Sequence, residues 1–213
     1  MTSDFRNYKW FFLIAILVLL STNVYSQEDR EKWKFQFALG LNNPLEDGST
    51  PGYYSKSMNF PTINLGIQHM LTSKIGAKLD FGYNRSSNDP NSLTYKLNYS
   101  RVNAQFVYDA FDLLNFLPSK VNLIGHVGPG LSFTKPLNNF SENSYTFLNL
   151  LAGIELHYGI SETVSVYGDL SYVLSLSNAE KYDIAVDGFS FNGDLIYATI
   201  GISVSISGCY FCE

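Results

Sequence analysis

The chain has 213 residues, of which 46% are hydrophobic and only 15% charged, and its net charge at pH 7 is −5. This acidic balance argues against a nucleic-acid partner, because such a partner requires a basic surface. The 16 Phe, 15 Tyr and 16 Gly residues favour many short strands joined by polar turns.

The first 26 residues are predicted to be a secretory signal peptide. Arg6 and Lys9 form a short basic region, and the apolar run WFFLIAILVLL follows at 10–20. A transmembrane helix would need about 20 apolar residues, and this run has eleven. Cleavage would leave residues 27–213 as one domain. It would remove two of the 14 basic and one of the 19 acidic residues, which leaves a net charge of −6.

Eight segments of the remaining chain alternate apolar and polar residues with a period of two, which is the pattern of a strand with two different faces. They are 33–42, 61–68, 75–84, 101–108, 121–128, 148–160, 164–175 and 195–206. No residue on the apolar parity of these segments is charged. No apolar run after residue 26 approaches the length of a membrane-spanning helix, so any membrane crossing must be made by strands.

The connections between these segments alternate in length. Residues 43–59, 85–94, 134–146 and 176–193 are long and polar, 70–74 and 161–163 are tight, and 109–120 is intermediate. The intermediate connection has the composition of a short amphipathic helix. Long loops at one end and tight turns at the other are typical of a transmembrane barrel.

The predicted fold is therefore all-β: an eight-stranded antiparallel up-and-down transmembrane barrel with its apolar parity toward lipid. In hydrocarbon, strands can satisfy their backbone groups only as a closed barrel. A soluble barrel would have to enclose the whole apolar parity, which is more than eight strands can hold. Tyr95, Leu97 and Tyr99 have the opposite parity from the apolar face of 101–108, so we expect a bulge or a strand extension near Ser100.

Aromatic side chains provide an independent check on this fold. If the first segment runs toward the end with the long loops, Trp33, Tyr108 and Tyr158 all fall at the opposite end of the barrel, and Tyr83 and Tyr172 fall toward the long loops. Because Tyr and Trp favour the two membrane interfaces, we interpret these five residues as interface aromatics.

The polar parity supplies charged and imidazole side chains to a narrow lumen. They are Lys34, Lys78, Asp80, Arg101, His126, Glu155, His157 and Asp169. Eight strands leave an interior that side chains fill, and an uncompensated buried charge is costly. We therefore predict a packed network of ion pairs and hydrogen bonds instead of a pore. Glu155 and His157 are expected to find partners among Lys34, Lys78 and Arg101.

Four stretches carry a resemblance to a known family. They are LNYSRVNAQFVYD, KVNLIGHVGPGLSF, LNLLAGIELHYGISETVSVYGDLSY and GFSFNGDLIYATIGISVSIS. They resemble the membrane barrel of OmpA-like outer-membrane proteins of Bacteroidetes type, best over residues 95–207. The resemblance implies a monomeric barrel of the cell outer membrane of a Gram-negative bacterium, with its long loops extracellular. It further implies an envelope or surface-contact role without a cofactor or enzymatic activity, and as partners outer-membrane lipid, lipopolysaccharide and the barrel-assembly machinery.

The last predicted strand resembles the assembly signal of such barrels. Thr199, Gly201, Val204 and Ile206 fit its polar, glycine and hydrophobic positions, although Ile206 stands where an aromatic residue is usual. This departure predicts less efficient recognition by the assembly machinery.

Other functions of the polar residues remain open. His126, His157 and Glu155 could form an acid–base set, and some small outer-membrane barrels modify lipid A. All three lie on the lumen parity and no serine accompanies a histidine on the lipid face, which favours the buried network. A conduit for small solutes is the other alternative, if the lumen charges are not paired.

Cys209 and Cys212 form a C-x-x-C pair near the C-terminus. We favour an incidental tail or a disulfide in an oxidising compartment, with a redox pair or a metal site as alternatives. A redox pair normally begins a helix, and a zinc site would need two further ligands.

Overall fold

A computed structural model describes residues 33–46, 53–111, 118, 120–176, 187–189 and 191–206. The predicted signal peptide and the pair Cys209 and Cys212 lie outside the described residues, as does most of the expected helix within 109–120. Among the described residues, no helix is both long and apolar enough to cross a membrane.

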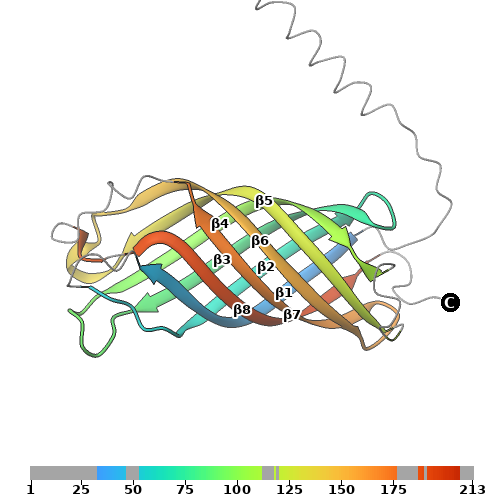
Figure 1. The fold of residues 1–213 in the computed structure, drawn as a ribbon, viewed down its shortest axis with the longest axis horizontal. Coiled ribbons are helices and arrows are strands. Elements are labelled where there is room, and N and C mark those ends of the chain that lie inside the picture. Colours follow the sequence, from blue (N-terminus) through green and yellow to red (C-terminus); the bar gives the residue numbers. More distant parts are fainter. Residues whose placement is uncertain are drawn as a thin grey trace, which may run out of the picture.

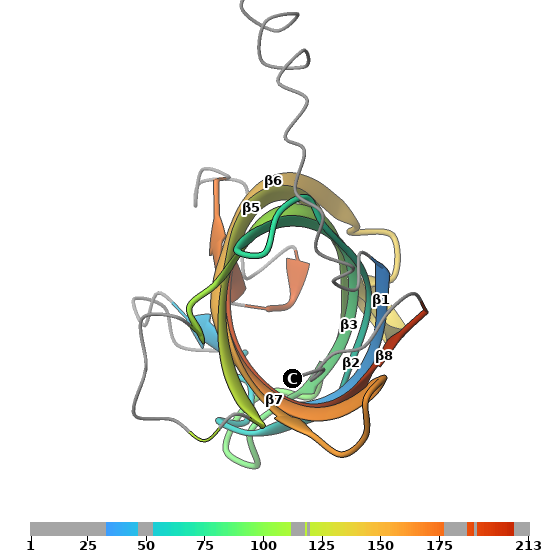
Figure 2. The same ribbon diagram turned by 90° about the vertical axis from the view of Figure 1, so that its right-hand side faces the viewer.

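Eight antiparallel strands close into one barrel, which confirms the predicted fold (Figures 1 and 2). The strands are β1 (Trp33–Glu46), β2 (Asn59–Met70), β3 (Ile75–Ser87), β4 (Lys96–Asp109), β5 (Val121–Pro136), β6 (Tyr145–Gly159), β7 (Val164–Ser175) and β8 (Phe191–Ser205). A short 3-10 helix, η2 (Asn138–Phe140), lies between β5 and β6. Each strand pairs with its neighbour in the chain, and β8 pairs with β1 to close the barrel.

Tight turns define one end of the barrel, which we call the turn end; the opposite end is the loop end. The turn after β2 is closed by the backbone N–H of Leu71, which donates to the carbonyl of Ile75 at 2.8 Å. The hydroxyl of Thr72 also accepts from the Ile75 N–H at 3.0 Å. Ser161 repeats this arrangement after β6, where its hydroxyl accepts from the Val164 N–H at 3.1 Å. A hydroxyl side chain thus satisfies a backbone donor that the short turn leaves unpaired.

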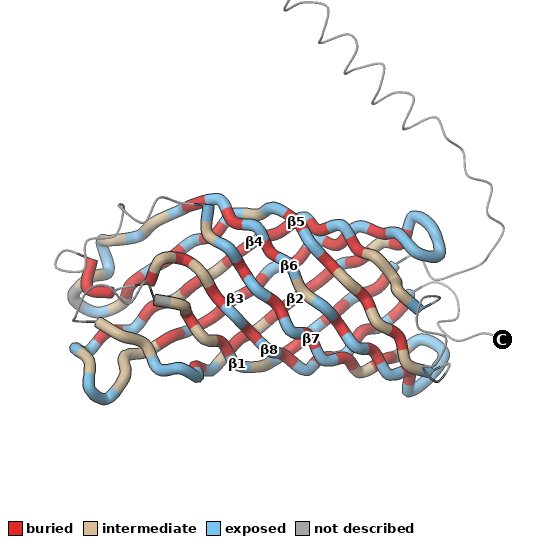
Figure 3. The backbone as a smooth tube through the Cα atoms, in the orientation of Figure 1, coloured by how far each residue is buried: buried red, intermediate tan, exposed pale blue. Residues whose placement is uncertain are grey.

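The two parities of each strand face opposite ways, as Figure 3 shows by the alternation of buried and exposed residues along the barrel. The apolar side chains of Phe37 and Ile200 are 47% and 72% exposed, whereas Gln36 and Thr199 beside them are 4% and 3% exposed. The predicted orientation, with the apolar parity outside, is confirmed. A soluble barrel with an apolar interior and a polar exterior is excluded.

The strands extend further toward the loop end than the alternation predicted. β4 pairs with β3 without interruption from Tyr108 opposite Ile75 to Lys96 opposite Ser87. The irregularity expected near Ser100 is therefore a strand extension and not a bulge. Register shifts occur instead along β1, between Gly40 and Asn42 against β2 and between Pro44 and Glu46 against β8.

Candidate functional site in the barrel lumen

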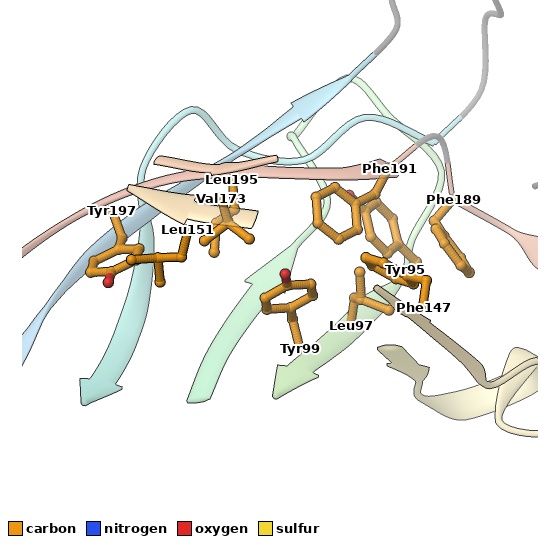
Figure 4. Close-up of a cluster of buried hydrophobic side chains, with 10 residues drawn as sticks. All are labelled: Tyr95, Leu97, Tyr99, Phe147, Leu151, Val173, Phe189, Phe191, Leu195 and Tyr197. Carbon is orange, nitrogen blue, oxygen red and sulfur yellow. The ribbon is translucent and has the colours of Figure 1, made fainter. Parts of the chain in front are cut away.

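Buried side chains in the lumen form a small apolar cluster next to the turns (Met70, Val107 and Ile124), then a polar layer, and then a larger apolar layer. The polar layer lies toward the turn end and includes Lys34, Gln36, Lys78, Asp80, Arg101, His126, Glu155, His157 and Asp169. The apolar layer lies toward the loop end and comprises Tyr95, Leu97, Tyr99, Phe147, Leu151, Val173, Phe189, Phe191, Leu195 and Tyr197 (Figure 4). The structure thus places all eight residues of the predicted lumen network inside the barrel.

Glu155 on β6 is the centre of the polar layer. Lys78 on β3 donates from Nζ to its Oε1 at 2.5 Å, and Gln36 on β1 donates from Nε2 to its Oε2 at 2.9 Å. Nε2 of His157 lies 2.7 Å from the same Oε2. The Glu155 side chain is therefore hydrogen-bonded to three partners, and these contacts join strands that face each other across the lumen. Of the three cations expected to be its partners, Lys78 pairs with it.

Asp169 and His126 lie beside this centre. Nε2 of His126 is 3.5 Å from Oδ1 of Asp169 and 4.0 Å from Oε1 of Glu155. The hydroxyl of Ser171 donates to Oδ1 of Asp169 at 2.6 Å. Gly153 makes room for this group, because a Cβ there would stand 2.1 Å from the Ser171 hydroxyl oxygen and 2.7 Å from the His126 ring.

Arg101 on β4 lies at the edge of the polar layer that faces the loop end. Its Nη1 donates to Oδ2 of Asp80 at 2.9 Å, and its Nη2 donates to Oδ1 of Asn64 at 3.1 Å. The guanidinium carbon lies 4.5 Å from the centre of the Tyr197 ring, within the range of a cation–π contact. Arg101 therefore pairs with Asp80 and contacts the apolar layer, and the proposed contact with Glu155 is not formed.

The apolar layer lies between Arg101 and the loop end of the barrel. Side chains from β4, β6, β7 and β8 converge there, as Figure 4 shows, together with Phe189 from the segment before β8. The rings of Tyr99 and Phe191 meet edge to face with centroids 5.5 Å apart. The Tyr145 hydroxyl donates to Oδ1 of Asp187 at 2.7 Å, which ties this segment to β6.

Sequence reasoning missed the apolar layer, although its signal was present. Tyr95, Leu97 and Tyr99 share the parity of Arg101, so a continuous β4 necessarily points them into the lumen. Leu151 on β6 likewise shares the parity of Glu155. Most large inward apolar residues thus lie toward the loop end, while Met70, Val107 and Ile124 form a smaller group at the turn end.

Ser165, His157 and Glu155 have the order of a hydroxyl, an imidazole and a carboxylate that hydrolases use for nucleophilic catalysis. The Ser165 hydroxyl oxygen is 3.1 Å from Nδ1 of His157, whose Nε2 is 2.7 Å from Glu155. Ser165 is only 2% exposed and His157 is fully buried. The imidazole is also stacked on the Tyr167 ring, with centroids 4.9 Å apart. The three side chains therefore form a chain of hydrogen bonds that is buried in the lumen.

His126, Glu155 and Asp169 are the described group of side chains that could hold a metal ion, with one ligand atom of each within 4.8 Å of the others. Lys78 opposes this use, because its ammonium group already neutralises Glu155. A metal ion would have to displace that ammonium group or await its deprotonation.

The predicted interface aromatics all point outward. Trp33 and Tyr158 are 48% and 55% exposed at the turn end, and the Trp33 ring packs on His69 with centroids 4.4 Å apart. Tyr108, on β4, is partly exposed at the same end. Toward the loop end the Tyr172 hydroxyl donates to Asp194 at 3.1 Å and the Tyr83 hydroxyl donates to Asn98 at 2.9 Å.

The residues of the predicted assembly signal lie on or directly after β8, the closing strand. Thr199 and Gly201 point inward, and Val204 and Ile206 point outward. Gly201 is required sterically, since a Cβ there would stand 2.4 Å from the backbone carbonyl oxygen of Phe37. Recognition by an assembly machinery stays a prediction.

No family model and no curated protein matches the chain, but solved structures do. Neisserial surface protein A superposes with a TM-score of 0.60 at 12% identity, over 82% of this chain and 97% of that one. Ail, the attachment invasion locus protein of Yersinia pestis, gives 0.53 at 17% identity over 83% and 100%. The outer membrane protein OprG of Pseudomonas aeruginosa gives 0.53 at 10% identity over 84% and 97%. At these identities the likeness establishes the fold, which is the eight-stranded barrel of outer-membrane proteins.

Proposed function

We propose that this protein is a non-enzymatic integral barrel of the cell outer membrane, with a closed lumen and long loops available for surface contact. The observation that carries the proposal is the combination of an outward apolar surface with a lumen that holds buried, paired charges and, toward the loop end, a buried apolar layer. A barrel that exposes such a surface requires lipid around it.

Several features support the outer membrane as its location. The signal peptide predicted for residues 1–26 would export the chain, and the closing strand carries the elements of an assembly signal. The outward aromatics toward both ends suit the two membrane interfaces. The resemblance over residues 95–207 supports an OmpA-like barrel of Bacteroidetes type, and with it an orientation in which the loop end is extracellular.

The contacts in the lumen support closure over conduction. Arg101 is fully buried and held by Asp80 and Asn64, and the apolar layer lies directly above it. One observation favours the alternative of a small-solute conduit: buried polar atoms of Gln105, and of Asn84 at the level of Tyr99, lack hydrogen-bond partners, and such atoms favour water in the lumen.

Planar bilayer recordings of the refolded full chain separate these two functions. We expect no steady single-channel conductance, because the lumen charges are paired and ions would have to pass the buried side chains of the apolar layer. Steady conductance would overturn the closed lumen. A variant with Phe189→Ala and Phe191→Ala serves as the internal comparison, and any conductance it shows identifies the apolar layer as the seal.

A further inference from the structure

A row of basic side chains lies on the outer surface of the barrel at the loop end. Arg85 on β3, Lys96 on β4 and Lys135 on β5 are all exposed. Asn98 on β4 pairs with Arg85 on one side and with Lys135 on the other. Neighbouring strands are about 4.8 Å apart, so Arg85 and Lys135 flank Asn98 on adjoining strands. We call Arg85, Lys96 and Lys135 the basic rim.

The basic rim begins where the apolar outer surface of these strands ends. The next outward-facing residues, two positions closer to the turn end, are Tyr83, Ser100 and Phe133. Tyr83 pairs with Ser100, and Ser100 pairs with Phe133. A further step brings the exposed side chains of Phe81, Val102 and Leu131 into one row. A lipid whose chains cover this row would bring its headgroup to the basic rim.

The charges of the basic rim are not neutralised by described residues of the chain. The ion pairs in the described part of the structure lie in the lumen and involve none of these three residues. Nε of Arg85 donates to Oδ1 of Asn98 at 2.9 Å, and the Tyr83 hydroxyl donates to the same oxygen. Asn98 thereby orients the guanidinium group, whose two terminal nitrogens remain available for an anion.

Among the strands that the structure describes, exposed basic side chains at the loop end lie on one side of the barrel. β6, β7 and β8 contain no Lys or Arg. At their loop ends these strands present Asp194 outward and Leu148 59% exposed. An anion at the lipid boundary would therefore choose the β3–β5 side.

We propose that the basic rim binds the phosphate groups of lipid A in the outer leaflet. This inference rests on the proposed outer-membrane location and deepens it by naming the lipid contact. Arg presents a planar pair of donors that matches phosphate, and Lys adds point charge. The rim lies on the lipid-facing parity and not at a loop tip, which favours a lipid phosphate over a soluble polyanion. The acyl chains would lie on Phe81, Val102 and Leu131.

The test uses the refolded full chain in phosphatidylcholine nanodiscs, titrated with lipid A and with dephosphorylated lipid A. A double variant, Arg85→Gln with Lys135→Gln, removes two charges from the rim. A matched control, Lys74→Gln with Lys120→Gln, removes the same charge from exposed residues at the turn end. We expect preference for the phosphorylated lipid and about a tenfold weaker affinity in the rim variant, with the control close to wild type.

Equal affinities of the rim variant and the wild type would overturn the inference, and so would equal losses in the rim variant and the control, which would reflect net charge alone. Titration with dextran sulfate serves as the probe for a soluble polyanion. If the rim variant loses affinity for dextran sulfate but keeps its affinity for lipid A, the rim is a soluble polyanion site and the inference is wrong. Heat-dependent gel migration of each variant establishes that it is folded. If the protein fractionates with the outer membrane but shows no preference for phosphorylated lipid A, this inference fails while the proposed function stands.

Discussion

At the scale of single residues, the buried ion pair of Lys78 and Glu155 determines how the side chains of the polar layer are arranged. Lys78 and Glu155 are 5% and 0% exposed, so neither charge can be solvated if its partner is removed. Burial of two opposite charges is a weak source of stability, but the loss of one member is costly, because the other charge stays buried. The pair therefore specifies the arrangement of the lumen more than it adds net stability.

A double-mutant cycle tests this coupling. We expect Lys78→Met and Glu155→Gln each to lower the free energy of unfolding by about 3–5 kcal/mol, because each leaves an unpaired buried charge. The double variant should be destabilised by much less than the sum of the two losses. Urea titrations of the refolded proteins in phospholipid vesicles measure the four values. Losses that simply add would show that the two side chains are not coupled.

Ser165 distinguishes a buried relay from a catalytic nucleophile. We expect cells that express the wild type, the Ser165→Ala variant or an empty vector to have the same lipid A mass spectrum, because this hydroxyl is enclosed. The variant should lose about 1 kcal/mol of stability through the missing hydrogen bond to His157. A lipid A product that forms with the wild type and disappears in the variant would establish an enzyme.

At the scale of elements, β5 shows how the barrel wall restricts side chains on one face only. Gly128 points inward, and a Cβ there would stand 2.0 Å from the backbone carbonyl oxygen of Ala104 on β4. Gly125 points outward on the same strand, and a Cβ there would meet no atom within 4 Å. The first glycine is required for close packing between strands, and the second is free of that constraint.

The two glycines of β5 form a matched pair for measurement. We expect Gly128→Ala to reduce the free energy of unfolding by about 1–3 kcal/mol, because β4 and β5 must separate or distort. Gly125→Ala should be neutral or stabilising by up to about 1 kcal/mol, because it restricts the unfolded chain. Unfolding in the same vesicles compares them, and a reversed order of the two effects would refute this account of the strand contact.

At the scale of the whole molecule, strand parity predicted the fold but not the contacts inside it. The alternation of Phe35 and Gln36 and its repeats along the chain specify which side chains face outward, because the period of a strand is two. Which inward residues meet depends on the stagger of all eight strands at closure, and local sequence does not contain this stagger. It brings Lys78 to Glu155 and Arg101 to Asp80.

The packing of the apolar layer also depends on this stagger, although the inward parity of its residues can be read from the sequence. Leu151 and Val173 lie on the inward parity, and the closed barrel places them side by side with Leu195 in the apolar layer (Figure 4). The barrel interior is thus a polar core with an apolar cover and is not uniformly polar. This division along the axis is what connects the fold to a closed lumen.

Heat-dependent gel migration of the protein from an isolated outer-membrane fraction tests whether the chain forms a closed barrel in that membrane. A closed barrel resists detergent without heating and migrates differently from the boiled, unfolded chain, so we predict a clear shift on boiling. The protein should also be absent from the soluble periplasmic fraction. A single boiling-independent band, or recovery of the protein in the periplasmic fraction, would contradict an integral outer-membrane barrel.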